Sequence, residues 1–249
     1  EITLERCDRI IEAAEKAGVK VGVIFPSRFA EVNQQLKQAI TGNRFGDFVL
    51  GDAYVKWHRT PAYYLSGKWR GSWQYDGGGA MMNQGIHAVD LLQWLMGPVK
   101  AVSAFASHIK HKNIEVEDTI VAALKFANGA LGTIECTTAA FPGALKRIEI
   151  MGTSGSVVIE ENNIKQWQFE KEMPSDDAVK NTGANNSSGG AADPAAINFL
   201  GHQKQMEDML HAIQNNSPLF IDAKEGRKSV EIILAAYKSA ASGEAVHLL

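Results

Sequence analysis

The segment DTIVAALKFANGALGTIECTTA, residues 118–139, indicates how most of this chain folds. It contains two strand-like runs, 118–126 and 130–139, on either side of Asn128-Gly129. That dipeptide is the strongest short-range signal for a hairpin, because both residues tolerate the positive φ angles of tight turns. The segment therefore predicts two adjacent antiparallel strands.

Runs of the same kind occur on both sides of this hairpin. Residues 48–59 alternate between polar and apolar as a strand does, and 101–109 form a second short run. Three more runs, at 146–152, 156–161 and 164–169, are joined by the short turns TSG and NN. Strands that follow one another with short connections favour an antiparallel sheet.

Helices are expected around this strand-rich region. Residues 31–40, 81–96, 199–216 and 223–242 have helical apolar spacing. We therefore expect an α+β fold, an open and predominantly antiparallel sheet with helices on one face. The polar segment 174–195, rich in Gly, Ser and Asn, is expected to be a mobile surface loop.

The first residues have a different character. Residues 3–17 show helical spacing, and 19–25 (VKVGVIF) form a nearly all-apolar run typical of a parallel strand buried on both faces. One helix and one strand cannot form a doubly wound sheet. We therefore interpret this part as the end of a larger domain whose start lies outside the sequence.

Composition limits the functional classes. The 249 residues are 45% hydrophobic with a net charge of −3, which is ordinary for a globular protein and indicates no nucleic-acid or membrane partner. No apolar run approaches the ~18 residues that a transmembrane helix needs. The two cysteines, Cys7 and Cys136, lie outside metal-ligand spacing. We expect reduced thiols, no metal site and a cytoplasmic protein.

Residues 77–90, GGGAMMNQGIHAVD, carry the candidate chemistry. Three glycines lead into the expected 81–96 helix, where four-residue spacing places Asn83 and His87 on one face. An amide and an imidazole suit a ligand with hydroxyl groups. Free N–H groups in the first turn would favour bound oxygen atoms, and the glycines would leave room for a ligand to approach. From spacing alone, the alternative is that Asn83 caps the helix and His87 is a satisfied core residue.

The wider pattern resembles one family, the Gfo/Idh/MocA oxidoreductases, which includes glucose–fructose oxidoreductase and inositol dehydrogenase. In that family a glycine-rich run leads into Asp-x-Gly-x-His-x-x-Asp, which NQGIHAVD at 83–90 matches except for its first residue. Residues 16–29, 57–73, 117–135 and 148–160 are also similar, in the family's usual order. The resemblance therefore covers nearly the whole chain.

The resemblance implies an NAD(P)-dependent dehydrogenase or reductase that acts on a sugar or polyol. Residues 1–27 would be the C-terminal remnant of a dinucleotide-binding Rossmann domain, and 28–249 a substrate-binding and oligomerisation domain. NAD or NADP would bind mainly to the segment before Glu1, where the family's Glu-Lys-Pro motif and its catalytic Lys belong. The fragment alone would be inactive. The open sheet face would form a homodimer or homotetramer.

The resemblance also implies site residues. His87 would be the catalytic acid/base or the group that orients the substrate hydroxyl. Asn83, where many members have an acid, would bind a substrate hydroxyl instead, and Asp90 would either orient His87 or be structural. Further substrate-binding residues are expected at the domain seam and in a segment that mixes aromatic rings with cations, namely Arg28, Lys56, Tyr64 and Arg70.

Two other functions stay open. The first is a non-catalytic sugar-ligand sensor or regulator of the same fold. The second is an interaction domain that uses its sheet only to dimerise, although His87 and the glycines argue mildly against it. The sequence does not indicate which sugar is bound or which direction the reaction takes.

Overall fold

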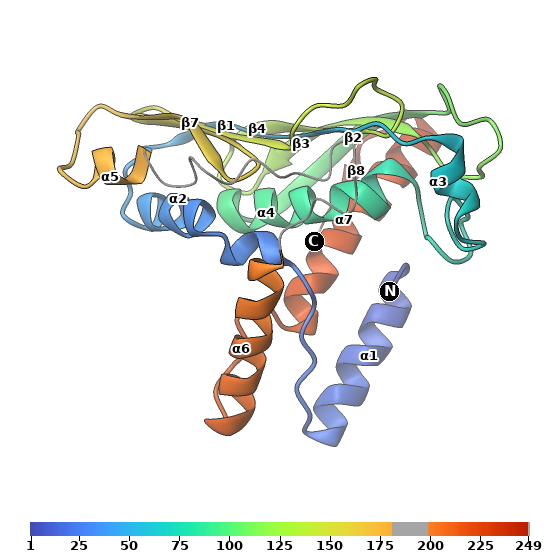
Figure 1. Cartoon of the computed structure of the whole chain (residues 1–249), viewed down its shortest axis with the longest axis horizontal. Coiled ribbons are helices and arrows are strands. Elements are labelled where there is room, and N and C mark those ends of the chain that lie inside the picture. Colours follow the sequence, from blue (N-terminus) through green and yellow to red (C-terminus); the bar gives the residue numbers. More distant parts are fainter. Residues whose placement is uncertain (181–198, 249) are drawn as a thin grey trace.

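A computed structural model describes residues 1–180 and 199–248 of the chain. Its centre is an open sheet of eight strands in the order β7-β6-β5-β1-β4-β3-β2-β8, with helices on one side (Figure 1). The strands are β1 (Phe48–Lys56), β2 (Val99–Ser107), β3 (Thr119–Phe126), β4 (Leu131–Thr137), β5 (Arg147–Gly152), β6 (Gly155–Glu160), β7 (Asn163–Phe169) and β8 (Val246–His247). Every neighbouring pair is antiparallel except β1 and β4, which are parallel. The predicted α+β class is confirmed.

The hairpin predicted at 118–139 is formed by β3 and β4, with Ile120 opposite Cys136. Of the two turn residues, only Gly129 has a positive φ, at 93°. The Asn128 side chain supports the turn by accepting a hydrogen bond from Ala130 N at 3.0 Å. The turn therefore needs its glycine for backbone freedom and its asparagine for a hydrogen bond.

The helices supply the second layer. They are α1 (Leu4–Ala17), η1 (Pro26–Phe29), α2 (Glu31–Thr41), α3 (Pro61–Leu65), η2 (Ala80–Gly85), α4 (Ile86–Met96), α5 (Asp176–Lys180), α6 (Leu200–Gln214) and α7 (Ala223–Ser242). None of the described helices is long and apolar enough to cross a membrane. The predicted loop at 174–195 falls largely outside the described residues, and its described part includes α5.

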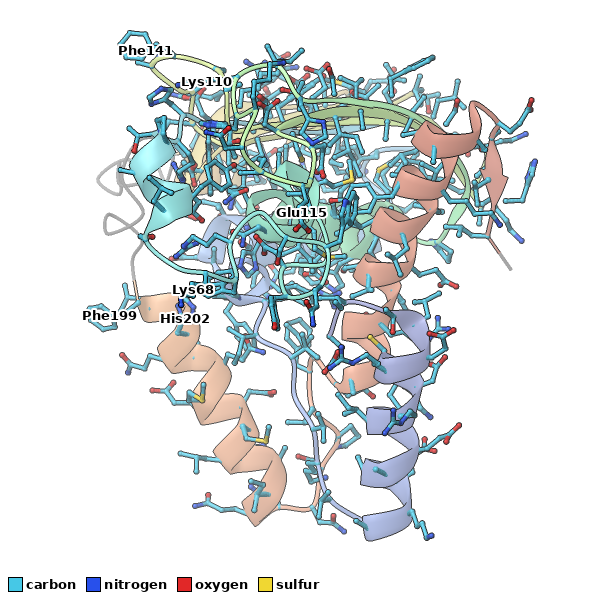
Figure 2. The ribbon with its side chains drawn as sticks, turned by 90° about the vertical axis from the view of Figure 1, so that its right-hand side faces the viewer. Lys68, Lys110, Glu115, Phe141, Phe199 and His202 are labelled. Carbon is cyan, nitrogen blue, oxygen red and sulfur yellow. The ribbon has the colours of Figure 1, made fainter. Side chains whose placement is uncertain are left out.

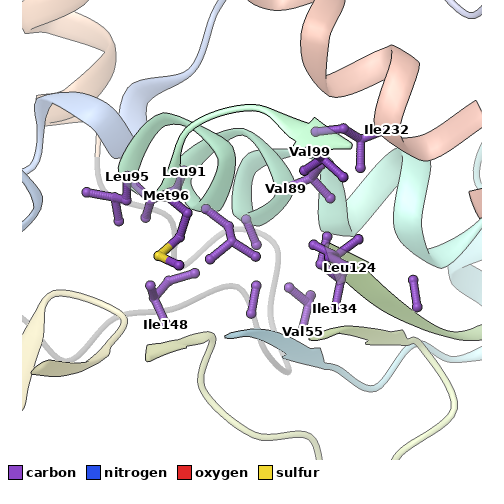
Figure 3. Packing of buried hydrophobic residues seen from close by; sticks show 14 of the residues in the cluster. Val55, Val89, Leu91, Leu95, Met96, Val99, Leu124, Ile134, Ile148 and Ile232 are labelled. Carbon is purple, nitrogen blue, oxygen red and sulfur yellow. The ribbon is translucent and has the colours of Figure 1, made fainter. Parts of the chain in front are cut away.

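The core lies between α4 and the sheet. Val89, Leu91 and Met96 of α4 belong to the same buried cluster as Val55 of β1 and Ile134 of β4 (Figure 3). Helix α4 is buried on nearly all sides, because the sheet covers one side and α7 packs against it as well. A helix surrounded in this way is apolar all round instead of amphipathic. This packing fixes the position of α4, which carries His87 in its first turn.

Residues 19–25 do not form the predicted strand. They contain one isolated bridge, between Gly22 and Asp222, and Val19 and Ile24 are 58% and 39% exposed. A strand buried on both faces needs strands beside it. Within the described residues, the bridge to Asp222 is the only strand-like pairing that this segment makes. Gln205 of α6 holds the segment instead, since its Oε1 accepts a hydrogen bond from Phe25 N at 2.9 Å.

Helices α1 and α6 project away from the sheet, as does one end of α7 (Figure 1). No residue of α1 is buried, although the helix touches α7 through an ion pair between Asp8 and Arg227 at 2.5 Å. Helix α6 exposes Met206, Leu210 and Ile213, each by more than half of its surface. The sheet with α4 is therefore the compact part of the molecule.

Candidate functional site

The candidate stretch enters its helix through a π-helical turn, η2, before α4 begins at Ile86. Such turns are rare and often occur at functional sites. They add a residue to the turn, so the regular α-helical spacing is interrupted between Asn83 and His87. Asn83 points toward Tyr63, and His87 lies against Phe25. The sharing of one face by Asn83 and His87 therefore stays a prediction, and the two side chains have different neighbours.

The N–H groups at the start of η2 are not free for a ligand. Ala80 N donates to the Glu117 carbonyl oxygen at 3.1 Å, and Gly79 N donates to the Glu117 carboxylate at 2.8 Å. Met81 N donates to the same carboxylate at 3.0 Å, and Met82 N donates to the Tyr237 hydroxyl at 3.2 Å. The expectation that these groups bind substrate oxygens is wrong, because other parts of the protein already satisfy them.

The glycine triplet also has a different role from the one expected. A Cβ at Gly78 would overlap the Tyr237 hydroxyl, and a Cβ at Gly79 would overlap the Glu117 carbonyl oxygen. Gly77 has a φ of 73°, and a Cβ there would overlap Ile2. The glycines therefore allow protein segments to approach closely, and the space beside them is not open to a ligand.

His87 is a half-buried imidazole whose ring meets Phe25 edge to face, with centroids 5.7 Å apart. Its Nδ1 is inaccessible to solvent and has no hydrogen-bond partner among the described residues. Burial lowers the pKa of His87 to about 4, and the nearby charges of Lys146 and His202 lower it further. At neutral pH the ring is therefore uncharged and able to accept a proton. A buried polar atom without a hydrogen-bond partner is uncommon in folded proteins.

Asn83 belongs to a hydrogen-bonded group centred on the hydroxyl of Tyr63. That hydroxyl donates to Asn83 Oδ1 at 3.3 Å and accepts from Gln84 Nε2 at 2.9 Å and from Arg70 Nη1 at 2.5 Å. Asn83 Nδ2 donates to Asp76 at 2.7 Å. The structure thus brings together two predicted binding residues, Asn83 and Arg70.

Arg70 and Arg59 alternate with aromatic rings. The Arg70 guanidinium lies 4.2 Å from the Tyr63 ring centroid and 4.3 Å from that of Trp69. The Arg59 guanidinium also lies against the Tyr63 ring, 5.3 Å from its centroid, and is 4.9 Å from the centroid of the Trp57 ring. None of the ion pairs among the described residues involves Arg70. A stacked guanidinium keeps its edge N–H groups available to carboxylate or phosphate oxygens.

Arg28 and Asp90 are placed together but away from solvent. Arg28 is 1% exposed and makes two hydrogen bonds to Asp90, at 2.9 and 2.7 Å, while Asp90 is fully buried. Arg28 also pairs with Glu225 at 3.1 Å, and Ser229 donates to Asp90 at 3.3 Å. Of the two roles considered for Asp90, this geometry supports the structural one. It gives no support to substrate binding by Arg28.

Lys56 and Tyr64 make no hydrogen bond within the described group around Tyr63, although the Tyr64 ring meets the Tyr63 ring edge to face with centroids 5.2 Å apart. Lys56 pairs with Glu135 at 2.6 Å, on the sheet face opposite to Val55 and therefore to α4. The Tyr64 hydroxyl shares a 2.7 Å hydrogen bond with Thr138, and burial raises the pKa of Tyr64 to about 12. The structure does not bring either side chain to His87 or Asn83.

Sequence reasoning missed several residues around the candidate site. Gln84 was passed over, although it connects Asn83 to Tyr63. Neither His202 nor Lys146 stands out in the sequence, yet both lower the pKa of His87. No group of side chains among the described residues could hold a metal ion. Only the fold brings α6 and the start of β5 toward α4, so no local pattern could have found them.

The chain combines an α+β domain that has an open sheet with a π-helical turn at the candidate site. Residues 33–158 match the family model of the GFO/IDH/MocA C-terminal domain, and the chain belongs to this family.

Among solved structures, the chain is similar to the WlbA dehydrogenase from Bordetella pertussis in complex with NADH and UDP-GlcNAcA. The identity is 32% with a TM-score of 0.88, over 100% of this chain and 69% of that one. The WlbA enzyme from Chromobacterium violaceum, with the same two ligands, is 33% identical with a TM-score of 0.88, over 100% and 68%.

Curated relatives include sugar and polyol oxidoreductases. The 1,5-anhydro-D-fructose reductase of Ensifer adhaerens is 24% identical over 99% of this chain and 70% of its own length. The myo-inositol 2-dehydrogenase of Thermotoga maritima is 30% identical over 63% of this chain and 46% of its own length. The chain therefore spans at most about 70% of these relatives.

Proposed function

We propose that the full-length protein is an NAD-dependent dehydrogenase that oxidises a hydroxyl group of a nucleotide-linked sugar acid. The observation that carries this proposal is the likeness to the two WlbA structures, at 32% and 33% identity with TM-scores of 0.88. Both of those enzymes are described with NADH and UDP-GlcNAcA. Other solved oxidoreductases that match the chain are 16–21% identical, with TM-scores from 0.72 to 0.82, and support the fold alone.

The charges of the site fit an anionic sugar derivative. A uridine diphosphate and a sugar carboxylate both present oxygens with negative charge, and Arg70 is a rigid guanidinium outside the described ion pairs. Asn83 would donate to a sugar hydroxyl or accept from it. It would do so close to Arg70, because both residues bond to the Tyr63 hydroxyl. A substrate that carries both groups would bind across Tyr63.

In this proposal His87 removes the proton from the reacting hydroxyl. Its neutral imidazole accepts a proton, and negative charge on a bound substrate would raise its low pKa toward neutrality. The nicotinamide cofactor, when bound, accepts the hydride. Asn83 cannot act as a base, so any role as proton acceptor falls to His87 and to groups outside these residues.

The division of the chain stays part of the proposal. Residues 1–27 would complete a dinucleotide-binding domain, and residues 28–249 would supply the substrate side. The described residues contain no glycine-rich turn between a strand and a helix that could bind a dinucleotide phosphate. Hollows along α1 and beside β7 contain none of the predicted site residues. The described residues would therefore form one wall of the site.

A cofactor-reduction assay of the full-length protein tests the proposal. Absorbance at 340 nm would be followed with NAD or NADP and with UDP-GlcNAcA, UDP-GlcNAc, free GlcNAcA or myo-inositol. We expect reduction of NAD with UDP-GlcNAcA and much slower reduction with the three other compounds. Reduction with myo-inositol alone would contradict the nucleotide-linked substrate. Binding of UDP-GlcNAcA in calorimetry without any reduction would favour the sensor.

A further inference from the structure

Glu117 is a buried carboxylate that holds the start of η2. It precedes β3, is 2% exposed and accepts from Gly79 N at 2.8 Å and from Met81 N at 3.0 Å. Its own carbonyl oxygen accepts from Ala80 N at 3.1 Å. No ion pair within the described part of the chain includes Glu117, and its side chain accepts hydrogen bonds from backbone N–H groups and one hydroxyl.

Tyr237 of α7 completes this arrangement. Its hydroxyl donates to Glu117 Oε1 at 2.9 Å and accepts from Gly79 N and Met82 N, both at 3.2 Å. Four successive N–H groups, those of residues 79–82, are thus satisfied by two residues that are distant in the sequence. Helix starts are usually capped by a residue of the same segment. Here the cap comes from the sheet layer and from another helix.

The cap determines where the site residues lie. Asn83 and Gln84 follow directly in η2, and His87 lies in the first turn of α4. Because hydrogen bonds fix the positions of Gly79–Met82, a change at Glu117 would shift the whole entrance relative to Tyr63 and Phe25. Burial raises the pKa of Glu117 to about 7, against the effect of its hydrogen bonds from Met81 N, Tyr237 and Gly79 N.

We propose that Glu117 and Tyr237 are positioning residues for the reaction, and that they hold η2 in the π-helical path that presents Asn83 and His87 to the substrate. This inference rests on the proposed function for its catalytic consequence. Its structural part, the control of η2, is independent of any activity.

Hydrogen exchange of the full-length protein tests the structural part. The variants are Glu117→Gln, which loses one carboxylate oxygen, and Tyr237→Phe, which loses only a hydroxyl. We expect amides 79–82 to exchange roughly fivefold faster or more, while β3 and the rest of α7 keep their protection. The control is Glu115→Gln, because Glu115 (Figure 2) accepts a similar bond from Trp73 N at 3.0 Å outside η2. Unchanged exchange of residues 79–82 in both variants would overturn the proposal.

Steady-state kinetics with UDP-GlcNAcA and NAD test the catalytic part. We expect kcat to fall about tenfold to a hundredfold in Glu117→Gln, with NAD affinity unchanged and partial recovery in Glu117→Asp. If kcat falls by no more than the fraction of unfolded protein that circular dichroism measures, a positioning role is overturned. Tyr237→Phe decides the question if Glu117→Gln does not fold. If the wild-type protein reduces no cofactor, the proposed function fails, and the exchange experiment still decides whether Glu117 controls η2.

Discussion

The His87 imidazole is neutral in the folded protein because burial disfavours its charged form, which lowers its pKa to about 4. Its solvent-shielded Nδ1 has no hydrogen-bond partner among the described residues. We expect His87→Gln in the full-length enzyme to lower kcat about a hundredfold or more, because an amide cannot take up the proton. The measurement is kcat with UDP-GlcNAcA and NAD, with circular dichroism to show that the variant is folded. Unchanged turnover in a folded variant would exclude His87 as the base.

The same pKa makes a prediction about acid stability. The unfolded His87 binds a proton near pH 6.5 and the folded one only near pH 4, so the free energy of unfolding should fall as the pH decreases through this range. The full effect is about 3 kcal/mol. Urea unfolding at pH 7 and pH 4.5 should show a smaller pH dependence for His87→Gln than for the wild type. An identical dependence in both proteins would contradict the low pKa.

The ion pair between Arg28 and Asp90 should matter for stability more than for substrate binding. Asp90→Asn leaves the Arg28 charge buried without its main partner, so we expect the free energy of unfolding to fall by about 3 kcal/mol. Replacing both residues, in Arg28→Met with Asp90→Leu, should recover much of this loss. Chemical denaturation measures both variants. A stable Asp90→Asn variant with a raised KM would instead support substrate binding by Arg28 and Asp90.

At this scale the sequence identified some of the candidate site and not the rest. Asn83 and Arg70 were each predicted as binding residues, and the structure adds that both bond to the Tyr63 hydroxyl. The partner of Arg28 was not predictable, because Asp90 follows it by 62 positions and only the packing of η1 on α4 joins them. Local patterns indicate which residue types are present, whereas pairing depends on the fold.

Among the elements, alternation and turn residues predicted β3 and β4 well, because both signals are local. The strand expected at 19–25 failed because apolar composition does not show whether partner strands are present. The π-turn η2 was not predicted either. It is capped by Glu117 and Tyr237, and neither contact leaves a signal in the 77–90 segment itself.

The close approach at η2 makes a prediction for one glycine. Gly79 has a φ of −107° and lies directly against the chain at Glu117. A methyl group there would overlap the Glu117 carbonyl oxygen, and we expect Gly79→Ala to lower the free energy of unfolding by about 2 kcal/mol or more. Gly42→Ala, at a helix end with a φ of −78°, is the control, and thermal unfolding is the measurement. If Gly79→Ala and the wild type have equal melting temperatures, η2 tolerates the displacement of Glu117 by the added methyl group.

For the whole molecule, the uncovered sheet face is the main unexplained surface. Phe105 and Val121 are paired across β2 and β3 and are 81% and 44% exposed, and Leu131 beside Leu50 is 54% exposed. Apolar patches of this kind often form subunit contacts. We expect the full-length protein to be a homodimer or homotetramer, and the pair Phe105→Glu with Leu131→Glu to dissociate it. Light scattering would measure both masses, and a monomeric wild type would exclude this interface.

The parallel contact between β1 and β4 also has a consequence for how the chain folds. Leu50 pairs with Leu131, so the loop that this contact closes encloses α3, η2, α4, β2 and β3. Closing a long loop has an entropic cost that a short hairpin avoids, and we expect β3 and β4 to associate before β1 joins them. Tyr63, Asn83 and His87 all lie inside that loop. During folding the reactive groups would therefore come together late, after the strands that support them.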